Sequence, residues 1–208
     1  SYTWFMKLQT ERLSLVPFSR ELAEPLAKLY TADWPNLAPW SPERDSSFFT
    51  TEGQLERLSE RIEAAEEGKE ASFAVYVEES GGLIGTVEVT EIVRGPLQQA
   101  FLGYWIAASS GGRGFATEAV KRVADYALEE LGLHRLEAGI MPRNVRSIRV
   151  IEKAGFCCEG VSHSFLQIAG VWEDMLRYVR FGTPASSTEN STRAVEGENP
   201  TTAGQYPR

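Results

Sequence analysis

The feature that most constrains the fold is a strand, a glycine-rich turn and an amphipathic helix in direct succession. Residues 103–120 read GYWIAASSGGRGFATEAV, and helical spacing of apolar residues continues to residue 131, where Gly132 is expected to end the helix. Glycines let a backbone approach an anion, and the first helical turn offers unpaired N–H groups at the positive end of its dipole. The unit predicts either a pyrophosphate cradle or simply a tight turn. It has neither the Lys-Ser/Thr of a P-loop nor a complete G-x-G-x-x-G.

Hydrophobic periodicity on both sides of this unit predicts one domain with a mixed central sheet. Antiparallel strands come first and a strand–helix–strand unit lies in the middle, so we expect an α/β (α+β) fold with about four flanking helices. A loop is expected at 31–50, and Thr51 with Gln54 has capping-box spacing. The expected strands are 6–16, 71–78, 83–90, 98–107, 133–141, 156–163 and 171–181, and the expected helices are 19–31, 51–67, 114–131 and 144–154.

Composition separates a folded part from a tail and excludes several classes of protein. We expect a domain at 1–182 and a disordered tail at 183–208, which is rich in Ser, Thr, Gly, Pro and Glu. The net charge of −8 argues against nucleic-acid binding, and no apolar run is long enough to cross a membrane. Two adjacent cysteines and two histidines predict no metal site, and Cys157 and Cys158 are expected to pack in the core. With no signal-peptide pattern at its start, the sequence predicts a cytoplasmic protein.

Positive charge is concentrated in one segment of this acidic chain. Between Gly112 and Lys153 there are eight basic and six acidic residues. Arg146, Arg149 and Lys153 share one face of the short helix that Asn144 is expected to cap. This face is either solvated or binds a polyphosphate. The acidic remainder is expected to favour a cationic amine as partner.

Two stretches make the sequence recognisable. SSGGRGFATEAVKRVADYA at 109–127 and MPRNVRSIRVIEKAGF at 141–156 resemble the GCN5-related N-acetyltransferase (GNAT) superfamily, in particular its RimJ/RimL-type branch. TERL at 10–13 and NLAPW at 36–40 also resemble that branch. The family loop motif Q/R-x-x-G-x-G/A maps to 111–116, with Gly111 where the family has Gln or Arg. The resemblance covers roughly residues 7–181 and implies the GNAT acyl-CoA N-acyltransferase fold with acetyl-CoA as donor.

The resemblance also implies where that donor is held. The pantetheine arm is expected along the exposed backbone of Tyr104–Ala107, with an amide near Ile106 or Ala107 polarising the thioester carbonyl. Asn144 either touches the arm or only caps its helix, and Arg149 is expected to contact the cofactor. The pyrophosphate is expected on the loop and first helical turn formed by Gly112, Arg113, Gly114, Phe115, Ala116 and Thr117.

The acceptor implied is a primary amine that attacks the thioester directly. The amine must be neutral, and an α-amine of pKa about 7.8 is roughly 10–20% neutral at pH 7, against below about 0.1% for lysine. An N-terminal α-amine of a protein, such as a ribosomal protein, or of a peptide is therefore expected. A small amine (amino acid, polyamine or aminoglycoside), a non-catalytic CoA-binding module and a generic nucleotide-phosphate binder are the alternatives. Either a monomer or a homodimer is compatible with the sequence.

Candidates for proton transfer follow from position and chemistry. Glu88 is the expected general base, with Glu91 second and in reach of substrate, although either can be a solvent-facing strand residue. Many family members use a Tyr in the short helix as the acid, and Ile151 stands there instead. Ser147 is the alternative donor, unless it only bonds its own helix backbone. Trp40 is expected either to line the acceptor side of the site or to anchor the 31–50 loop to the core. His163 is expected either to line the acceptor cleft or to be structural.

Overall fold

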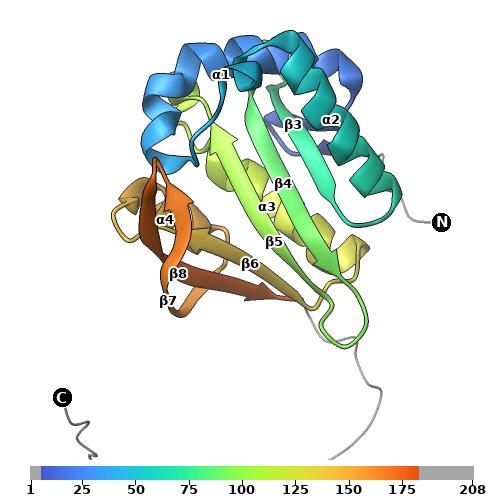
Figure 1. Ribbon diagram of the computed structural model, residues 1–208. Helices are drawn as coiled ribbons and strands as arrows, with labels where there is room; N and C mark the ends of the chain where they lie inside the picture. The colour runs from blue at the N-terminus through green and yellow to red at the C-terminus, as the bar shows by residue number, and fades with distance from the viewer. Residues whose placement is uncertain (1–5, 183–208) are drawn as a thin grey trace, which may run out of the picture.

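The computed structural model describes residues 6–182, so the tail expected at 183–208 lies outside the described residues (Figure 1). The strands are β1 (Leu8–Gln9), β2 (Leu13–Pro17), β3 (Ala71–Val77), β4 (Leu83–Val93), β5 (Gln99–Ile106), β6 (Arg135–Ile140), β7 (Cys157–Ile168) and β8 (Val171–Phe181). The helices are α1 (Ala23–Leu37), α2 (Thr51–Glu66), α3 (Phe115–Asp125) and α4 (Val145–Lys153). A π-helical turn, Tyr126–Glu130, continues α3. None of the described helices is long and apolar enough to span a membrane.

The eight described strands form one mixed sheet in the order β1-β2-β3-β4-β5-β6-β8-β7. Every neighbouring pair is antiparallel except β5 and β6, which are parallel and joined through α3. A parallel pair needs such a crossover because the chain must return to the same end of the sheet. The expected mixed sheet with four flanking helices is thus confirmed.

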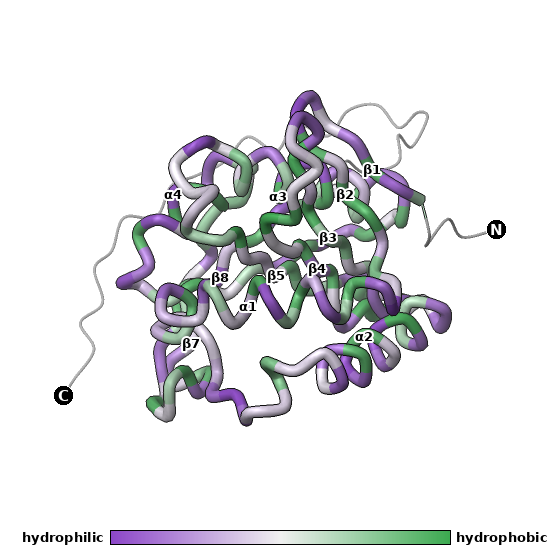
Figure 2. The backbone as a smooth tube through the Cα atoms, turned by 90° about the horizontal axis from the view of Figure 1, so that it is seen from above, coloured by the Kyte–Doolittle hydropathy of each residue, from purple (hydrophilic) through white to green (hydrophobic). Residues whose placement is uncertain are grey.

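The helices cover both faces of the sheet. Seen from above, α3 and α4 lie on one side of the strands, and α1 and α2 lie on the other (Figure 2). Alternation along β3 builds both cores: Phe73 and Val75 pack with α3, whereas Ala74 packs with α1 and α2. The same alternation sends successive side chains of every central strand into different layers, which matters for the site.

Several local expectations need correction. The strand expected at 6–16 is broken into β1 and β2 by a turn. The helix expected to end at residue 31 continues to Leu37 and takes up part of the expected loop; Pro25 lies in its first turn, where proline is tolerated, and Pro35 lies inside it. The α2 N-cap is Thr50 rather than Thr51, since the Thr50 side chain accepts a hydrogen bond from the Gly53 amide at 3.1 Å. Both cysteines are exposed on β7 and do not pack in the core.

Candidate active site at the parted strands

The central feature of the site is a gap between the two parallel strands. β5 and β6 pair only from Gln99–Arg135 to Phe101–Glu137. Beyond that point β6 continues to Ile140 in partnership with β8 alone, and the two strands diverge, as Figure 1 shows. The gap leaves the backbone of β5 beyond Phe101 without a neighbouring strand on its β6 side, while its other side stays paired with β4.

The hydrogen-bond pattern of β5 shows which amides face the gap. The Ala107 amide donates to the Ile84 carbonyl at 2.8 Å, toward β4. Amides alternate in direction along a strand, so those of Tyr104 and Ile106 point to the opposite edge, where β6 has moved away. Of the two amides expected to polarise a carbonyl, that of Ile106 is therefore available and that of Ala107 is not.

The turn after β5 forms a cradle at the start of α3. Gly112 and Gly114 have φ of 74° and 82°, in the left-handed region that favours glycine, and a Cβ on Gly112 would meet nothing within 4 Å. Gly114 is the N-cap residue of α3 and no side chain caps this helix, in contrast to α2 and α4. The amides of residues 115–117 are thus left without an intrahelical partner, which fits a bound pyrophosphate.

The side chains around this cradle differ in what they can offer a ligand. Phe115 is 2% exposed and packs into the core, so only its amide is available. The exposed Arg113 has its guanidinium 4.6 Å from the centre of the Phe115 ring. Ala116 and Thr117 are half-buried in the first turn. The loop therefore offers mainly backbone amides and one cationic side chain.

The cradle is held from outside by the chain segment before β2. The Glu118 carboxylate accepts hydrogen bonds from the Thr10 hydroxyl at 2.5 Å, the Arg12 amide at 3.0 Å and the Arg12 Nε at 2.7 Å. Arg12 Nη1 also donates to the Arg113 carbonyl at 3.0 Å. Burial opposes ionisation of Glu118, but these bonds outweigh it and lower its pKa. The TERL motif at 10–13 therefore has a structural task that sequence reasoning missed: it fixes the loop and first turn of α3.

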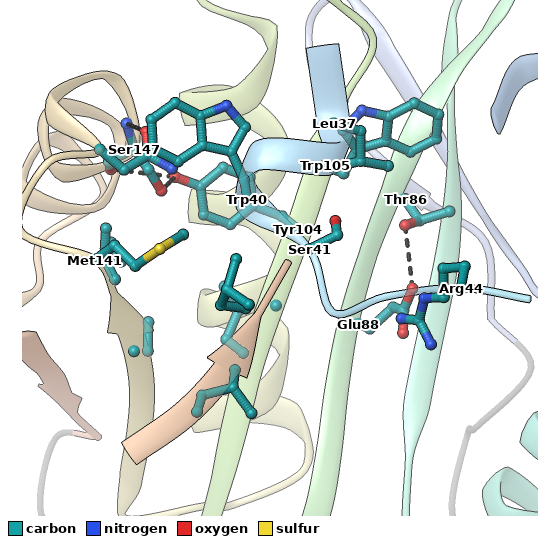
Figure 3. Close-up of a pocket in the computed structure, with 18 of the residues that line it drawn as sticks. Leu37, Trp40, Ser41, Arg44, Thr86, Glu88, Tyr104, Trp105, Met141 and Ser147 are labelled. Carbon is teal, nitrogen blue, oxygen red and sulfur yellow. Dashed lines mark hydrogen bonds between the residues drawn. The ribbon is translucent and has the colours of Figure 1, made fainter. Parts of the chain in front are cut away.

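One cavity of about 280 Å³ joins the two faces of the sheet through the gap. Side chains of β5 alternate, so Tyr104 faces the α3–α4 layer and Trp105 the α1–α2 layer. The cavity reaches both layers: Ser147 lines it from α4, and Trp40 lines it from the short helical turn Ala38–Trp40 that follows α1. In the view of Figure 3, Ser147 and Tyr104 lie at one end of this cavity, and Glu88 and Arg44 lie at the other. Two molecules that approach from opposite faces can therefore meet at the gap.

At the α4 end, two hydroxyl groups are in direct contact. The Tyr104 and Ser147 hydroxyl oxygens are 2.6 Å apart, and the Tyr104 hydroxyl also lies 3.1 Å from the Ser147 carbonyl. Burial raises the pKa of Tyr104 to about 12, against the opposing effect of the Ser147 hydrogen bond. Ile151, at the family's usual Tyr position, is fully buried in the core. A tyrosine hydroxyl is thus supplied from β5 instead of α4, which the sequence did not reveal because Tyr104 was expected to act through its backbone.

Asn144 has the capping role expected of it, and its contact with the cofactor arm stays a prediction. Its side-chain oxygen accepts a hydrogen bond from the Ser147 amide at 3.2 Å, which caps α4 and sets the orientation of Ser147. The same residue lines the cavity. Arg149, by contrast, is exposed on α4 outside the cavity lining, with no carboxylate of the described chain within 4 Å. Its predicted contact with the cofactor would therefore have to be made from the exposed side of the helix.

At the opposite end, Glu88 is the only carboxylate among the described residues that line the cavity. Arg61 Nη2 donates to its Oε2 at 2.5 Å, and the Thr86 hydroxyl donates to its Oε1 at 3.1 Å. Arg61 also binds Glu70 at 2.7 Å. Both oxygens of Glu88 are engaged, although each keeps a lone pair for a further donor.

Of the other residues predicted on the acceptor side, Trp40 borders the cavity, whereas Glu91 and His163 lie outside it. Trp40 is 37% exposed and borders the cavity, and the Arg143 guanidinium lies 4.9 Å from its ring centre. Glu91 is exposed at φ 52° in the irregular part of β4 and does not line the cavity, so the structure does not bring it to the site. His163 is on β7, 2.8 Å from Asp174 through its Nδ1, also outside the lining.

Asp33 is a further residue that sequence reasoning missed. This buried carboxylate on α1 accepts hydrogen bonds from the Trp105 indole at 3.0 Å and from the Ala108 amide at 3.1 Å. It connects α1 to the point where β5 ends and the cradle begins. No sequence motif marks it, because its partners are 72 and 75 residues away.

A parted parallel pair, a cradle at a helix N-terminus and a cavity through the sheet define an acyl-CoA-dependent transferase. The sequence profile of the acetyltransferase (GNAT) domain matches residues 12–157. The chain belongs to the GNAT family and is an acetyl-CoA-dependent N-acetyltransferase. Within the family it is most similar to the RimJ/RimL ribosomal-protein acetyltransferase branch.

Individual relatives support this assignment. The probable N-acetyltransferase YjcK of Bacillus subtilis is 48% identical over 131 residues, which cover 63% of this chain and 72% of the relative. The ribosomal-protein-S5-alanine acetyltransferase of Vibrio fischeri superposes with a TM-score of 0.82 at 29% identity, covering 87% of this chain and 99% of the other. Mycobacterium smegmatis RimJ, solved in complex with CoA-disulfide, superposes with a TM-score of 0.77 at 27% identity, and the match covers 81% of this chain and 81% of the other.

Proposed function

We propose that this enzyme acetylates the α-amino group of a protein or peptide N-terminus. The observation that carries the proposal is the state of Glu88, which alone among the described cavity-lining residues can accept a proton as a carboxylate and is already bound by Arg61 and Thr86. Such a base suits an amine that is partly neutral at pH 7. An α-amine of pKa about 7.8 meets that condition far better than a lysine of about 10.4.

The donor side follows from the gap and the cradle. The amides at the start of α3 and the Arg113 side chain hold the pyrophosphate, and the edge of β5 pairs with the pantetheine arm through the amides of Tyr104 and Ile106. The Ile106 amide is the donor that polarises the thioester carbonyl. Acetyl-CoA supplies the activated acetyl group. The basic face of α4, including Arg149, lies on the same side of the sheet as the cradle.

The protons move at opposite ends of the cavity. The amine enters from the α1–α2 face beside Trp40, and Glu88 accepts its proton, directly or through a water molecule. The bond from nitrogen to the acetyl carbon forms, and the bond from that carbon to sulfur breaks. Ser147 then donates its hydroxyl proton to the leaving thiolate and accepts the hydroxyl proton of Tyr104 in its place. The resting state returns when Glu88 releases its proton to solvent and the Tyr104 phenolate takes one up from solvent. Tyr104 is suited to this role because a pKa of about 12 keeps it protonated at neutral pH.

Similarity to known enzymes supports the same acceptor class. The Vibrio fischeri protein is a ribosomal-protein-S5-alanine acetyltransferase, and the likeness covers 87% of this chain. A peptide N-terminus is accordingly the first acceptor to test.

The test uses the purified chain, acetyl-CoA and three matched acceptors. These are a peptide with a free N-terminal alanine and no lysine, the same peptide with a blocked N-terminus and one internal lysine, and a polyamine. CoA release is measured and the acetylated product is located by mass spectrometry. We expect turnover only of the free α-amine. Exclusive acetylation of lysine or polyamine, with normal CoA binding, would overturn the proposal.

A further inference from the structure

Three arginines line the acceptor end of the cavity. Arg57 and Arg61 are one helical turn apart on α2, and Arg44 comes from the segment before the short helical turn Ser46–Phe49. All three lie on the face from which the proposed acceptor enters. The cavity lining thus holds three guanidinium groups and a single carboxylate, Glu88.

The arginines differ in whether their charge is neutralised. Arg61 binds both Glu88 and Glu70. Arg44 and Arg57 have no carboxylate within 4 Å among the described residues and contact the Phe48 ring instead, with distances from guanidinium to ring centre of 4.9 and 4.6 Å. Two like charges therefore share one aromatic ring without an anion between them.

The surroundings of this pair compensate its positive charge only in part. The Nε of Arg57 is buried and has no hydrogen-bond partner. Burial, followed by the charge of Arg57, lowers the pKa of Arg44, and the charge of Glu88 opposes this shift without cancelling it. Acidic residues do occur in the adjoining hollow that both arginines also border, namely Glu43, Asp45, Glu56 and Glu60, but none forms an ion pair with either guanidinium. Asp45 is engaged with the amide and hydroxyl of Ser47.

Such a pair is unfavourable on its own and favourable once an anion binds. Arg57 is half-buried, so its charge loses hydration and its unpaired Nε adds to that cost, whereas Arg44 is exposed and adds a second positive charge beside it. A carboxylate or phosphate would accept charge-assisted hydrogen bonds from the guanidinium groups of both arginines. The position of the pair, in the same cavity as Glu88 and on its acceptor face, indicates that this anion belongs to the acceptor molecule.

We propose that Arg44 and Arg57 form an anion-binding subsite that selects acceptors with a carboxylate close to the reacting amine, such as a peptide with an acidic residue after its N-terminal residue. The location of the acceptor rests on the proposed function. The subsite also contradicts the expectation, drawn from the net charge, that acidic residues favour a cationic acceptor. Although the whole chain is acidic, the acceptor end of the cavity is lined mainly by arginines. The same positive charge disfavours the ammonium form of the incoming amine and so increases the neutral fraction that can attack.

The experiment compares peptides that differ at one position. Peptides beginning Ala-Glu, Ala-Gln and Ala-Lys, otherwise identical, are assayed for kcat/KM with saturating acetyl-CoA at low ionic strength. We expect Glu to exceed Gln by about 10-fold, with Lys lowest, and the preference to decrease with added salt. Equal rates for the three peptides, or a preference for Lys, would contradict the subsite.

Variants assign the preference to the arginines. Arg44→Gln and Arg57→Gln, singly and together, should remove the preference for Glu while the Ala-Gln peptide is still turned over, and Arg44→Glu should shift the preference toward Lys. Arg20→Gln, at an exposed arginine before α1, is the matched control and should keep the full preference. CoA affinity and the melting temperature, measured for each variant, verify folding. An unchanged preference in the double variant overturns the proposal.

A second arm distinguishes the source of the anion. Free alanine and alaninamide are compared in the same assay. Faster acetylation of alanine, with no turnover of any peptide, retains the anion subsite and contradicts the proposed peptide acceptor. Turnover of all peptides without charge preference retains the proposed function and contradicts the subsite.

Discussion

The hydroxyl oxygen of Tyr104 on β5 lies 2.6 Å from the hydroxyl oxygen of Ser147 on α4. This contact places two exchangeable protons on the donor side of the gap. Ser147 is both a helix residue and a cavity-lining one, so its proposed role can be separated from a structural role by comparison with a helix serine elsewhere. Ser59 on α2 is suitable, since its hydroxyl donates to the Leu55 carbonyl at 2.8 Å and it lies outside the cavity.

The first prediction concerns this hydroxyl pair. Ser147→Ala and Tyr104→Phe should each lower kcat, by at most about 100-fold, because a thiolate is already a fair leaving group. The CoA dissociation constant should change little. Ser59→Ala and Tyr76→Phe, the latter at a strand tyrosine outside the lining, should leave kcat unchanged. Steady-state kinetics and calorimetry with CoA check both parts. Loss of CoA binding with unchanged kcat at saturation would assign the pair to cofactor binding instead.

The second prediction concerns the base. Glu88→Gln should lower kcat/KM at pH 7 by about 10- to 100-fold. The loss should shrink as the pH rises to 9, because an α-amine of pKa about 7.8 then becomes neutral without assistance. Glu91→Gln, at the exposed carboxylate on the same strand, should behave like wild type. A pH–rate profile of the three proteins provides the comparison; a loss that is independent of pH would point to a role for Glu88 in positioning Arg61.

The third prediction concerns the contact between Arg12 and Glu118. Glu118→Gln should lower the free energy of unfolding at pH 7 by about 1 kcal/mol, since Arg12 is largely exposed and the ion pair is partly screened. The pKa of Glu118 is lowered in the folded state, so its contribution is present above the unfolded pKa and is lost as the pH falls through the folded value. Denaturant unfolding at several pH values should show the two proteins converging in acid. A constant difference down to pH 2 would exclude this linkage.

The fourth prediction concerns the cradle. Gly112→Ala adds a Cβ at φ 74° and should cost about 1 kcal/mol in stability. Gly81→Ala in the β3–β4 turn is a matched control, since it has φ 65° and equally open surroundings. Both variants should lose similar stability, but only Gly112→Ala should weaken CoA binding. Thermal melts and CoA titrations measure the two effects separately, and equal CoA affinity in both variants would mean that the loop does not contact the cofactor.

The features that sequence reasoning located are those in which local residues carry the information. The glycine turn before α3 and the Asn144 cap of α4 depend on residues within a few positions of one another, and both are present. Strand alternation located the central strands for the same reason. The end of α1 was missed because Pro35, normally a helix breaker, lies within the helix. Glu91 was wrongly expected near Glu88, because strand alternation places residues 88 and 91 on opposite faces and β4 is irregular between Thr90 and Val93.

The residues that could not be predicted are those brought together only by the fold. Arg44 and Arg57 lie in separate segments, and nothing in their spacing shows that they share the Phe48 ring. The Tyr104 hydroxyl meets Ser147 across 43 positions of sequence. A net charge summed over the chain also cannot show that the cavity is lined by arginines. Side-chain chemistry at such a site depends on which face of each strand is presented, and that is decided by the register of the whole sheet.

The parting of β5 and β6 has a consequence for the end of the catalytic cycle. Apart from the Ile106 amide, the proposed cofactor site consists of strand-edge and helix amides that contact the arm and the pyrophosphate, which acetyl-CoA and CoA have in common. Binding free energy from these groups cannot distinguish the spent carrier from the loaded one. Product CoA should therefore compete with acetyl-CoA at similar concentration, and the ratio of the two, rather than the amount of either, should govern the rate at which this enzyme works.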